Sequence, residues 1–253
     1  MVCRAMFALP EWQALPVVER DLLFAAALLH DVSKPACTRH EDDGRITSRG
    51  HSQRGALVAR RLLWERDVEI SIREQVCALV RFHQVPFYLI ERPNAKRMVL
   101  RMSQSLRCRH LAILAKADAL GRRCADQQEL LTRIGLFEEL CRELECLDAP
   151  WPFADGLSRF EYFRREDRDP GYAAYDASKC EVILMSGLPA SGKDTWLRQV
   201  APMGFPVISL DALREEFADR GQVIQAAKEQ ARVYLRAGTA FAWNATNLIR
   251  EGS

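Results

Sequence analysis

The sequence lacks a long apolar run, a paired cysteine motif and a strong net charge. Its most apolar segment, residues 22–29, ends at His30-Asp31 and is far shorter than the ~20 residues that a membrane-spanning helix needs. We therefore expect a cytoplasmic chain with no membrane span and no signal peptide. The net charge of +2 gives no general signal for nucleic-acid binding, so a polyanion site must be a local patch.

Cysteine is present without a recognisable metal or disulfide pattern. The eight cysteines are scattered and include no CxxC pair. In a cytoplasmic protein this favours reduced thiols over disulfides. We interpret these residues as small buried apolar side chains.

The first part of the chain is predicted to be helical. With 253 residues, of which 48% are hydrophobic and 28% charged, the chain can form one large or two small globular domains. Nothing up to residue 147 alternates like a strand, and residues 38–50 read as a polar loop. The middle of the helix at 17–31 is apolar on all sides, which predicts that it is buried at the domain centre. We predict an all-α domain over residues 1–147, with helices at 1–9, 17–31, 51–66, 69–83, 95–104, 107–121 and 126–147.

Residues 148–179 read as an aromatic-rich connector. A disordered linker would rarely carry so many aromatic residues. We therefore expect an ordered segment whose aromatic side chains pack on one or both domains, namely Trp151, Phe153, Phe160, Tyr162 and Phe163.

Residues 180–253 alternate between apolar strands and amphipathic helices. This β-α-β-α-β pattern predicts a parallel sheet with crossover helices. Three strands are fewer than a phosphate-loop domain usually has, so we expect a partial α/β domain. The strands are expected at 181–186, 206–210 and 240–243, and the helices at 193–200 and 223–236.

The segment EVILMSGLPASGKDT, residues 181–195, has the pattern of a phosphate-binding loop. A short apolar strand breaks at Gly187, and Gly192-Lys193 opens a helix. The backbone N–H groups of such a loop, around Ser191 here, surround a phosphate at a helix N-terminus. Lys193 would add a positive charge on the β- and γ-phosphates.

The loop departs from the strict pattern at one position. Asp194 stands where Ser or Thr is usual, and Thr195 follows it. A carboxylate can still contact Mg²⁺ directly or through water. We therefore predict a site for ATP or another NTP with Mg²⁺, made by Gly187, Ser191, Gly192, Lys193, Asp194 and Thr195.

Polar residues in the helical domain predict a metal site. His30-Asp31 closes an apolar helix, and Asp118 lies within the apolar LAILAKADAL segment, where an unpaired carboxylate is costly. His51 opens one helix and His83 ends another. Imidazole and carboxylate ligands suit one or two divalent ions of the manganese, iron, cobalt, nickel or zinc type. Such a centre favours hydrolysis of phosphoesters.

These residues resemble the HD phosphohydrolase superfamily, whose pattern is a His, a His-Asp doublet and a distal Asp. His30-Asp31 matches the doublet and Asp118 the distal aspartate. The resemblance implies that His51 and His83 are the extra histidines of dinuclear members. It also implies that this domain holds a divalent transition metal.

Two further expectations follow from this resemblance. Lys34, in the segment HDVSKP, matches a lysine often placed near the scissile phosphate. The family's first histidine has no counterpart in residues 1–29, and the helix at 1–9 lacks a start signal. We therefore expect that histidine to lie before Met1.

The second predicted strand of the C-terminal part ends in the sequence SLDALR. An aspartate in the ligand crevice at the carboxyl end of a strand, here Asp211, can act as a general base, and Arg214 could hold a substrate phosphate. Alternatively, Asp211 caps a helix and Arg214 is merely exposed. Together, GLPASGKDT, SLDALR and FAWNATN resemble the 5′-OH polynucleotide kinases. That resemblance implies a base at Asp211, a phosphate clamp at Arg214, and an acceptor site near Asn244 and Asn247.

An HD domain followed by such a kinase resembles the bacterial HD-Pnk end-healing enzymes over nearly the whole chain. The resemblance implies removal of 2′,3′-cyclic or terminal phosphates from RNA ends, and NTP-dependent phosphorylation of 5′-OH ends of RNA or DNA. Because those kinases continue with an arginine-bearing lid, we expect the chain to be truncated at both ends. The alternatives are an HD nucleotidase whose phosphate loop binds nucleotides without catalysis, and a non-enzymatic remnant.

Overall fold

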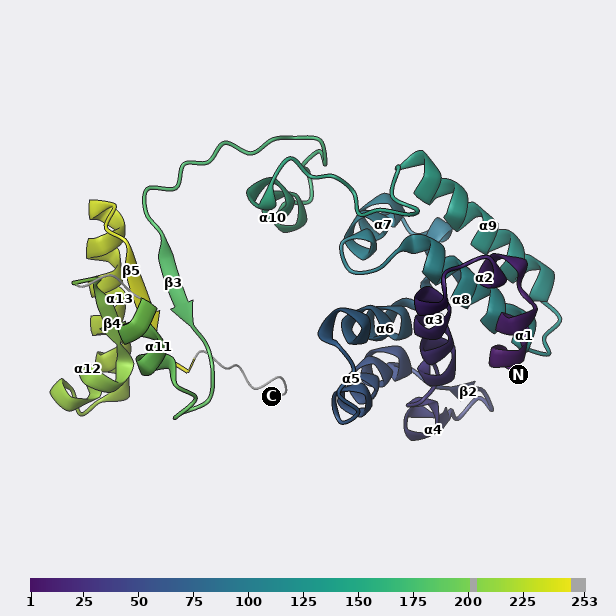
Figure 1. Ribbon diagram of the computed structural model, residues 1–253, viewed down its shortest axis with the longest axis horizontal. Helices are drawn as coiled ribbons and strands as arrows, with labels where there is room; N and C mark the ends of the chain where they lie inside the picture. The colour runs from purple at the N-terminus through teal and green to yellow at the C-terminus, as the bar shows by residue number, and fades with distance from the viewer. Residues whose placement is uncertain (201–203, 247–253) are drawn as a thin grey trace. The chain divides into compact units, whose positions relative to one another are not determined.

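The computed structural model describes residues 1–200 and 204–246. The chain divides into two compact units, Met1–Ala173 and Ala174–Ser253. Figure 1 shows the helices of the first unit and the strands of the second. Among the described residues, no helix combines the length and the apolar character that crossing a membrane requires.

The first unit is helical, as predicted. Two 3-10 turns, η1 (Val85–Phe87) and η2 (Leu89–Glu91), follow α6. Side chains cap two of its helices: Glu69 accepts from backbone amides at the start of α6, and Asp155 does so at the start of α10. The α-helices are α1 (Val2–Ala8), α2 (Pro10–Gln13), α3 (Val17–Leu29), α4 (Lys34–Cys37), α5 (His51–Trp64), α6 (Ile70–Phe82), α7 (Ala95–Ser103), α8 (Cys108–Gly121), α9 (Gln127–Glu143) and α10 (Gly156–Arg164).

Helix α8 lies in the core of this unit. It is buried along most of its length, from Cys108 to Ala119, and its many alanines let neighbouring helices approach closely. Helix α3 buries Leu23 and Ala26 completely, but Leu28 is 64% exposed. The prediction that the apolar middle of α3 is buried on all sides is therefore wrong. Helix α3 packs against α8 and α6 and leaves its outer face in solvent.

The predicted polar loop contains a small hairpin that the sequence did not predict. Strand β1 (Arg39–His40) pairs antiparallel with β2 (Ile46–Thr47). Gly44 in the turn has a φ of 81°, a left-handed conformation that glycine adopts without steric cost. Two-residue strands are too short to produce a visible alternation in the sequence.

Aromatic side chains from the predicted connector pack on the helical unit. Tyr162, on α10, is buried, and Phe153 and Phe163 pack partly buried around it at ring-centroid distances of 5.4 and 4.9 Å. Arg97 of α7 donates to the carbonyl oxygens of residues 162 and 165. Phe160 is the exception, because it is 56% exposed.

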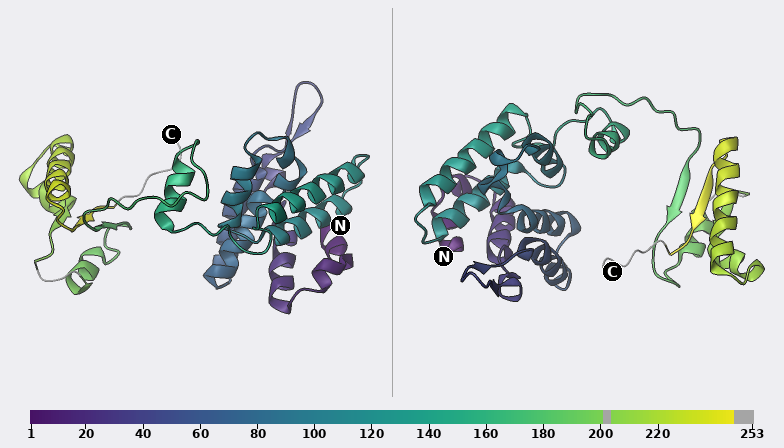
Figure 2. Two further views of the ribbon diagram at one scale, coloured as in Figure 1. Left: turned by 90° about the horizontal axis from the view of Figure 1, so that it is seen from above. Right: turned by 180° about the vertical axis from the view of Figure 1, so that it is seen from behind.

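The second unit holds the predicted parallel sheet. Its strand order is β3-β5-β4, so the last strand within the described residues lies in the centre. The views in Figure 2 and Figure 1 show the long helix α13 running beside the strands. The elements are β3 (Val182–Met185), α11 (Lys193–Val200), β4 (Val207–Ser209), α12 (Leu210–Glu216), α13 (Arg220–Ala237) and β5 (Phe241–Asn244).

A small apolar core holds this unit together, and the strand register aligns the strand ends. Ile208 of β4 and Phe241 of β5 pack against Leu213 of α12 and Val223 of α13. Met185, Asn244 and Ser209 pair side by side at the carboxyl ends of their strands. The segments that follow β3 and β4 therefore leave the sheet at the same edge, where parallel α/β sheets bind ligands. Helix α12 begins directly after β4 with no turn between them.

The packing of α1 on α8 generates a stability prediction. A Cβ atom at Gly121 would lie 2.8 Å from the Val2 Cα atom and 2.9 Å from its backbone nitrogen. Gly121→Ala should therefore push α1 away and lower the free energy of unfolding by about 1–3 kcal/mol. Denaturant unfolding followed by circular dichroism measures this.

Gly135→Ala, on α9, is the matched control. A Cβ there meets no atom within 4 Å, so the change should be neutral or stabilise the unit by up to about 1 kcal/mol. Equal stability of Gly121→Ala and the unchanged chain would contradict the described α1–α8 contact.

Candidate metal centre and phosphate loop

Three histidines at helix ends turn their rings toward one region. His30 follows α3, His51 begins α5 and His83 follows α6. Each ring Nδ1 lies close to the carbonyl oxygen three residues earlier, at 2.8, 2.6 and 2.8 Å respectively. Because a carbonyl only accepts hydrogen bonds, we assign a ring proton to Nδ1, so in the neutral ring Nε2 carries a free lone pair.

Asp31 stands among these three Nε2 atoms. Its Oδ1 atom lies 3.3 Å from Nε2 of His51 and 3.8 Å from Nε2 of His83, and its Oδ2 atom lies 3.4 Å from Nε2 of His30. The ligand atoms of Asp31, His51 and His83 all lie within 4.8 Å of one another. The structure thus gathers side chains that lie up to 53 positions apart in the sequence, from residue 30 to residue 83.

These atoms have no other partner. Within the described residues, Nε2 of His30, His51 and His83 and Oδ1 of Asp31 are buried and make no hydrogen bond. A buried polar atom left without a partner costs about 1–3 kcal/mol. A divalent transition metal bound among Asp31, His51 and His83 would satisfy three of these atoms at once, because imidazole nitrogen and carboxylate oxygen are the ligands that such ions accept. The donor set therefore fits a metal ion.

Burial and neighbouring charges shift the pKa values of three residues in the cluster. Burial lowers the pKa of His83 to about 4, so this ring is neutral near pH 7. Burial also opposes a charge on His30, but the neighbouring Asp31 carboxylate outweighs it and raises the pKa of His30. For Asp31, the desolvation that would raise its pKa is outweighed by His30 and Lys34, which hold the pKa well below its usual range. Asp31 is therefore an anion at neutral pH.

Asp118 of α8 lies at the edge of this cluster. Its Oδ1 atom is 3.7 Å from Nε2 of His30, and the residue is only 2% exposed. Arg122, one turn later, donates to both oxygens of Asp118, with Nε 3.0 Å from Oδ1. Its guanidinium carbon lies 4.9 Å from the ring centroid of Phe87. Asp118 thus already has a cationic partner, which the sequence pattern did not predict.

Lys34 of α4 lies between the cluster and solvent. Its Nζ donates to Oδ2 of Asp31 at 2.9 Å, and its side chain is 43% exposed. A cation in this position can pair with Asp31 and still be reached by an anionic phosphate from outside.

In the second unit, the predicted phosphate loop has the backbone that this function needs. Ala190 and Gly192 adopt left-handed φ values of 61° and 86°. A Cβ atom at Gly187 would lie 2.8 Å from Oγ of Ser191, so a side chain there would displace the serine hydroxyl. Lys193 Nζ donates to two carbonyl oxygens of the loop, at 3.1 and 2.8 Å. Its ammonium group therefore lies over the loop, where a phosphate would bind.

The residues after the lysine contact the central strand. Asp194 and Thr195 lie in the exposed first turn of α11. Oδ1 of Asp194 accepts a hydrogen bond from Nδ2 of Asn244, the last residue of β5. Asn244 is therefore engaged with the loop helix. Asn247 lies outside the described residues.

Asp211 and Arg214 are both accessible on α12. Their side chains are 84% and 56% exposed and form an ion pair. The interpretation of Asp211 as a helix cap is wrong, because the cap is Ser209, whose Oγ atom accepts from the amide of Ala212. Strand β4 ends one residue earlier than predicted, which moves the start of the helix to Leu210.

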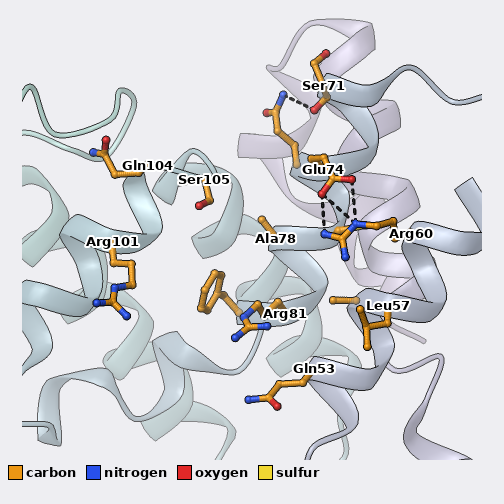
Figure 3. A pocket seen from close by; sticks show the side chains of 14 residues that line it. Gln53, Leu57, Arg60, Ser71, Glu74, Ala78, Arg81, Arg101, Gln104 and Ser105 are labelled. Carbon is orange, nitrogen blue, oxygen red and sulfur yellow. Dashed lines mark hydrogen bonds and ion pairs between the residues drawn. The ribbon is translucent and has the colours of Figure 1, made fainter. Parts of the chain in front are cut away.

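A groove of about 600 Å³ lies between α5, α6 and α7, and no sequence motif indicated it (Figure 3). Its lining includes Arg60, which pairs with Glu74, and Arg81 and Arg101, which make no ion pair within the described part of the chain. On α5, the groove residues lie on the helix face opposite His51. The groove is therefore separate from the histidine cluster.

Comparison with known proteins agrees with this arrangement. Residues 4–123 match a family model described as HD domain, and residues 182–252 match one described as AAA domain. A CC-adding tRNA nucleotidyltransferase from Thermus thermophilus is 33% identical over 135 residues, which cover 52% of this chain and 29% of that protein. The chain thus spans less than a third of that relative's length. No solved structure matches.

The fold predicted from the sequence is confirmed at this level. The chain joins a helical HD domain to a P-loop kinase-like domain with a parallel sheet. The five predicted metal ligands lie within the first match, and the phosphate loop lies within the second.

The histidine cluster generates a prediction about metal affinity. Asp31→Asn and His83→Ala should each weaken Mn²⁺ binding by at least ~10–100-fold, because each removes a donor from the cluster. Isothermal titration of the metal-free chain, without nucleotide, measures this.

His40→Gln serves as the control, because His40 is an exposed histidine of the same unit. It should bind Mn²⁺ as the unchanged chain does. Unchanged affinity in both cluster variants, with a normal far-UV spectrum, would show that the cluster is not the metal site.

Proposed function

We propose that this protein is a nucleic-acid end-healing enzyme. Its HD domain removes 2′,3′-cyclic or terminal phosphates from RNA ends, and its P-loop domain phosphorylates 5′-OH ends with ATP or another NTP. The observation that carries the proposal is the buried set of unpartnered nitrogen and oxygen atoms on His30, Asp31, His51 and His83. The similarity to a protein named for its action on tRNA supports RNA as the substrate.

In the HD domain, His30, Asp31, His51, His83 and Asp118 would hold a divalent transition metal. When bound, such an ion acts as a Lewis acid on a phosphoryl oxygen and makes water a nucleophile at neutral pH. Asp31 supplies the negative charge of the ligand set, because Lys34 and His30 keep it ionised. The half-exposed Lys34 would bind the phosphate of the substrate.

In the P-loop domain, Lys193 would exchange its bonds to loop carbonyls for the β- and γ-phosphates of the NTP. Asp194 and Thr195 would contact the Mg²⁺ of the nucleotide, directly or through water. Asp211 would accept the proton of the attacking 5′-OH group, and Arg214 would hold a phosphate of the acceptor strand. Their exposure on α12 leaves both open to a strand end.

The test compares substrates with the purified chain in Mn²⁺, Ni²⁺, Co²⁺ or Zn²⁺. An RNA ending in a 2′,3′-cyclic phosphate should be hydrolysed faster than free nucleotides or p-nitrophenyl phosphate, and Asp31→Asn should abolish this. Preference for free nucleotides, together with NTP binding but no phosphoryl transfer, would favour a nucleotidase with a non-catalytic phosphate loop. No hydrolysis with any metal would refute the phosphohydrolase assignment.

Substitutions at Lys193 and Asp211 should separate the loss of nucleotide binding from the loss of phosphoryl transfer. Lys193→Ala removes a charge-assisted contact worth about 1.5–3 kcal/mol, so NTP affinity should fall about ten- to a hundredfold. Asp211→Asn should keep NTP affinity and lose 5′-phosphorylation of a 5′-OH oligonucleotide. Lys228→Ala, at an exposed lysine on α13, is the matched control and should change neither.

A further inference from the structure

Three of the scattered cysteines come together in the helical unit. Cys108, Cys141 and Cys146 are each 0% exposed, and their Sγ atoms all lie within 4.8 Å of one another. None of these cysteines belongs to the histidine cluster. The interpretation of the cysteines as small buried apolar side chains does not account for this grouping.

The end of helix α9 brings two of these thiols together. Glu145 adopts a left-handed φ of 52°, and the amides of Glu145 and Cys146 donate to the carbonyls of Arg142 and Cys141, both at 2.9 Å. These two bonds form a Schellman motif at the C-terminus of α9. The motif begins at Cys141 and ends at Cys146, and it brings these two side chains into contact. A glycine usually occupies the left-handed position, so Glu145 makes this turn at a conformational cost.

The third thiol comes from the start of helix α8. Cys108 is the first residue of that helix, and the amide of Arg109 donates to the carbonyl of Leu147 at 2.9 Å. This bond fixes the start of α8 beside the turn that carries Cys146. The N-terminus of a helix also stabilises a thiolate.

We propose that Cys108, Cys141 and Cys146 form a thiolate site for a soft divalent metal ion of the zinc class. Three sulfur atoms bound to one such ion at ~2.3 Å lie about 3.8–4.0 Å apart, so the observed grouping needs only a small contraction. The site is independent of the proposed function. It would tie the end of α9 to the start of α8, the helix that carries Asp118.

Cobalt tests the site, because a thiolate-bound Co²⁺ ion has a charge-transfer absorption that nitrogen and oxygen ligands do not give. When Co²⁺ is added to the reduced, metal-free full chain, this band should grow until thiolates bind one Co²⁺ ion per chain. Added Zn²⁺ should then remove the band. Cys141→Ser and Cys146→Ser should each lose the band. Cys77→Ser, at a buried cysteine outside the cluster, should keep it.

A second measurement covers variants that fail to fold. In the unchanged chain, bound Zn²⁺ should slow alkylation of Cys108, Cys141 and Cys146 by at least ~10-fold, with no effect on Cys77. Absence of the charge-transfer band and of this protection would overturn the proposal. So would a band unchanged in folded Cys141→Ser, or a disulfide found within the cluster by mass spectrometry.

Discussion

The hydrogen bonds from histidine Nδ1 to nearby carbonyls are the constraint on which the helical unit's chemistry depends. The last carbonyls of an α-helix have no partner within the helix. His30 and His83 stand directly after α3 and α6 and bond to the carbonyl three residues earlier. One bond thus completes the helix end and fixes the ring, so that Nε2 points inward. The end of a helix, rather than a flexible loop, therefore sets the position of Nε2 in His30 and in His83.

This arrangement buries polar atoms that lack hydrogen-bond partners. The charged groups around the cluster limit which ion can bind to these atoms. Asp31 is anionic and lies 3.3–3.8 Å from three imidazole nitrogens. Lys34 pairs with Asp31, and Arg122 pairs with the neighbouring Asp118. Arg122 neutralises Asp118, which would otherwise be an unpaired carboxylate in the core. A cation that enters the centre must therefore compete with Arg122 for Asp118, but faces no such competition at the histidines.

The sequence predicted the features that a local residue pattern encodes, and it missed the features that depend on tertiary packing. His-Asp after an apolar helix indicated buried ligands, and GLPASGKDT indicated the loop, because each chemistry needs adjacent residues. The exposed face of α3 could not be predicted, since its composition does not show that α8 occupies the centre. The thiol cluster was equally hidden. Its residues are 33 and 5 positions apart, from 108 to 141 to 146, and meet only through a helix end and a tertiary hydrogen bond.

The phosphate loop depends on a tertiary constraint of the same kind. Strand β5 follows β3 and β4 in the sequence but pairs with both. Its terminal Asn244 donates to Asp194, and the amide of Gly187 donates to the carbonyl of Thr246. The phosphate loop, which is the clearest motif in the sequence, is thus held by residues about fifty to sixty positions later in the chain. Because such distant pairings close late, we expect the loop to be fixed only when β5 inserts between its neighbours.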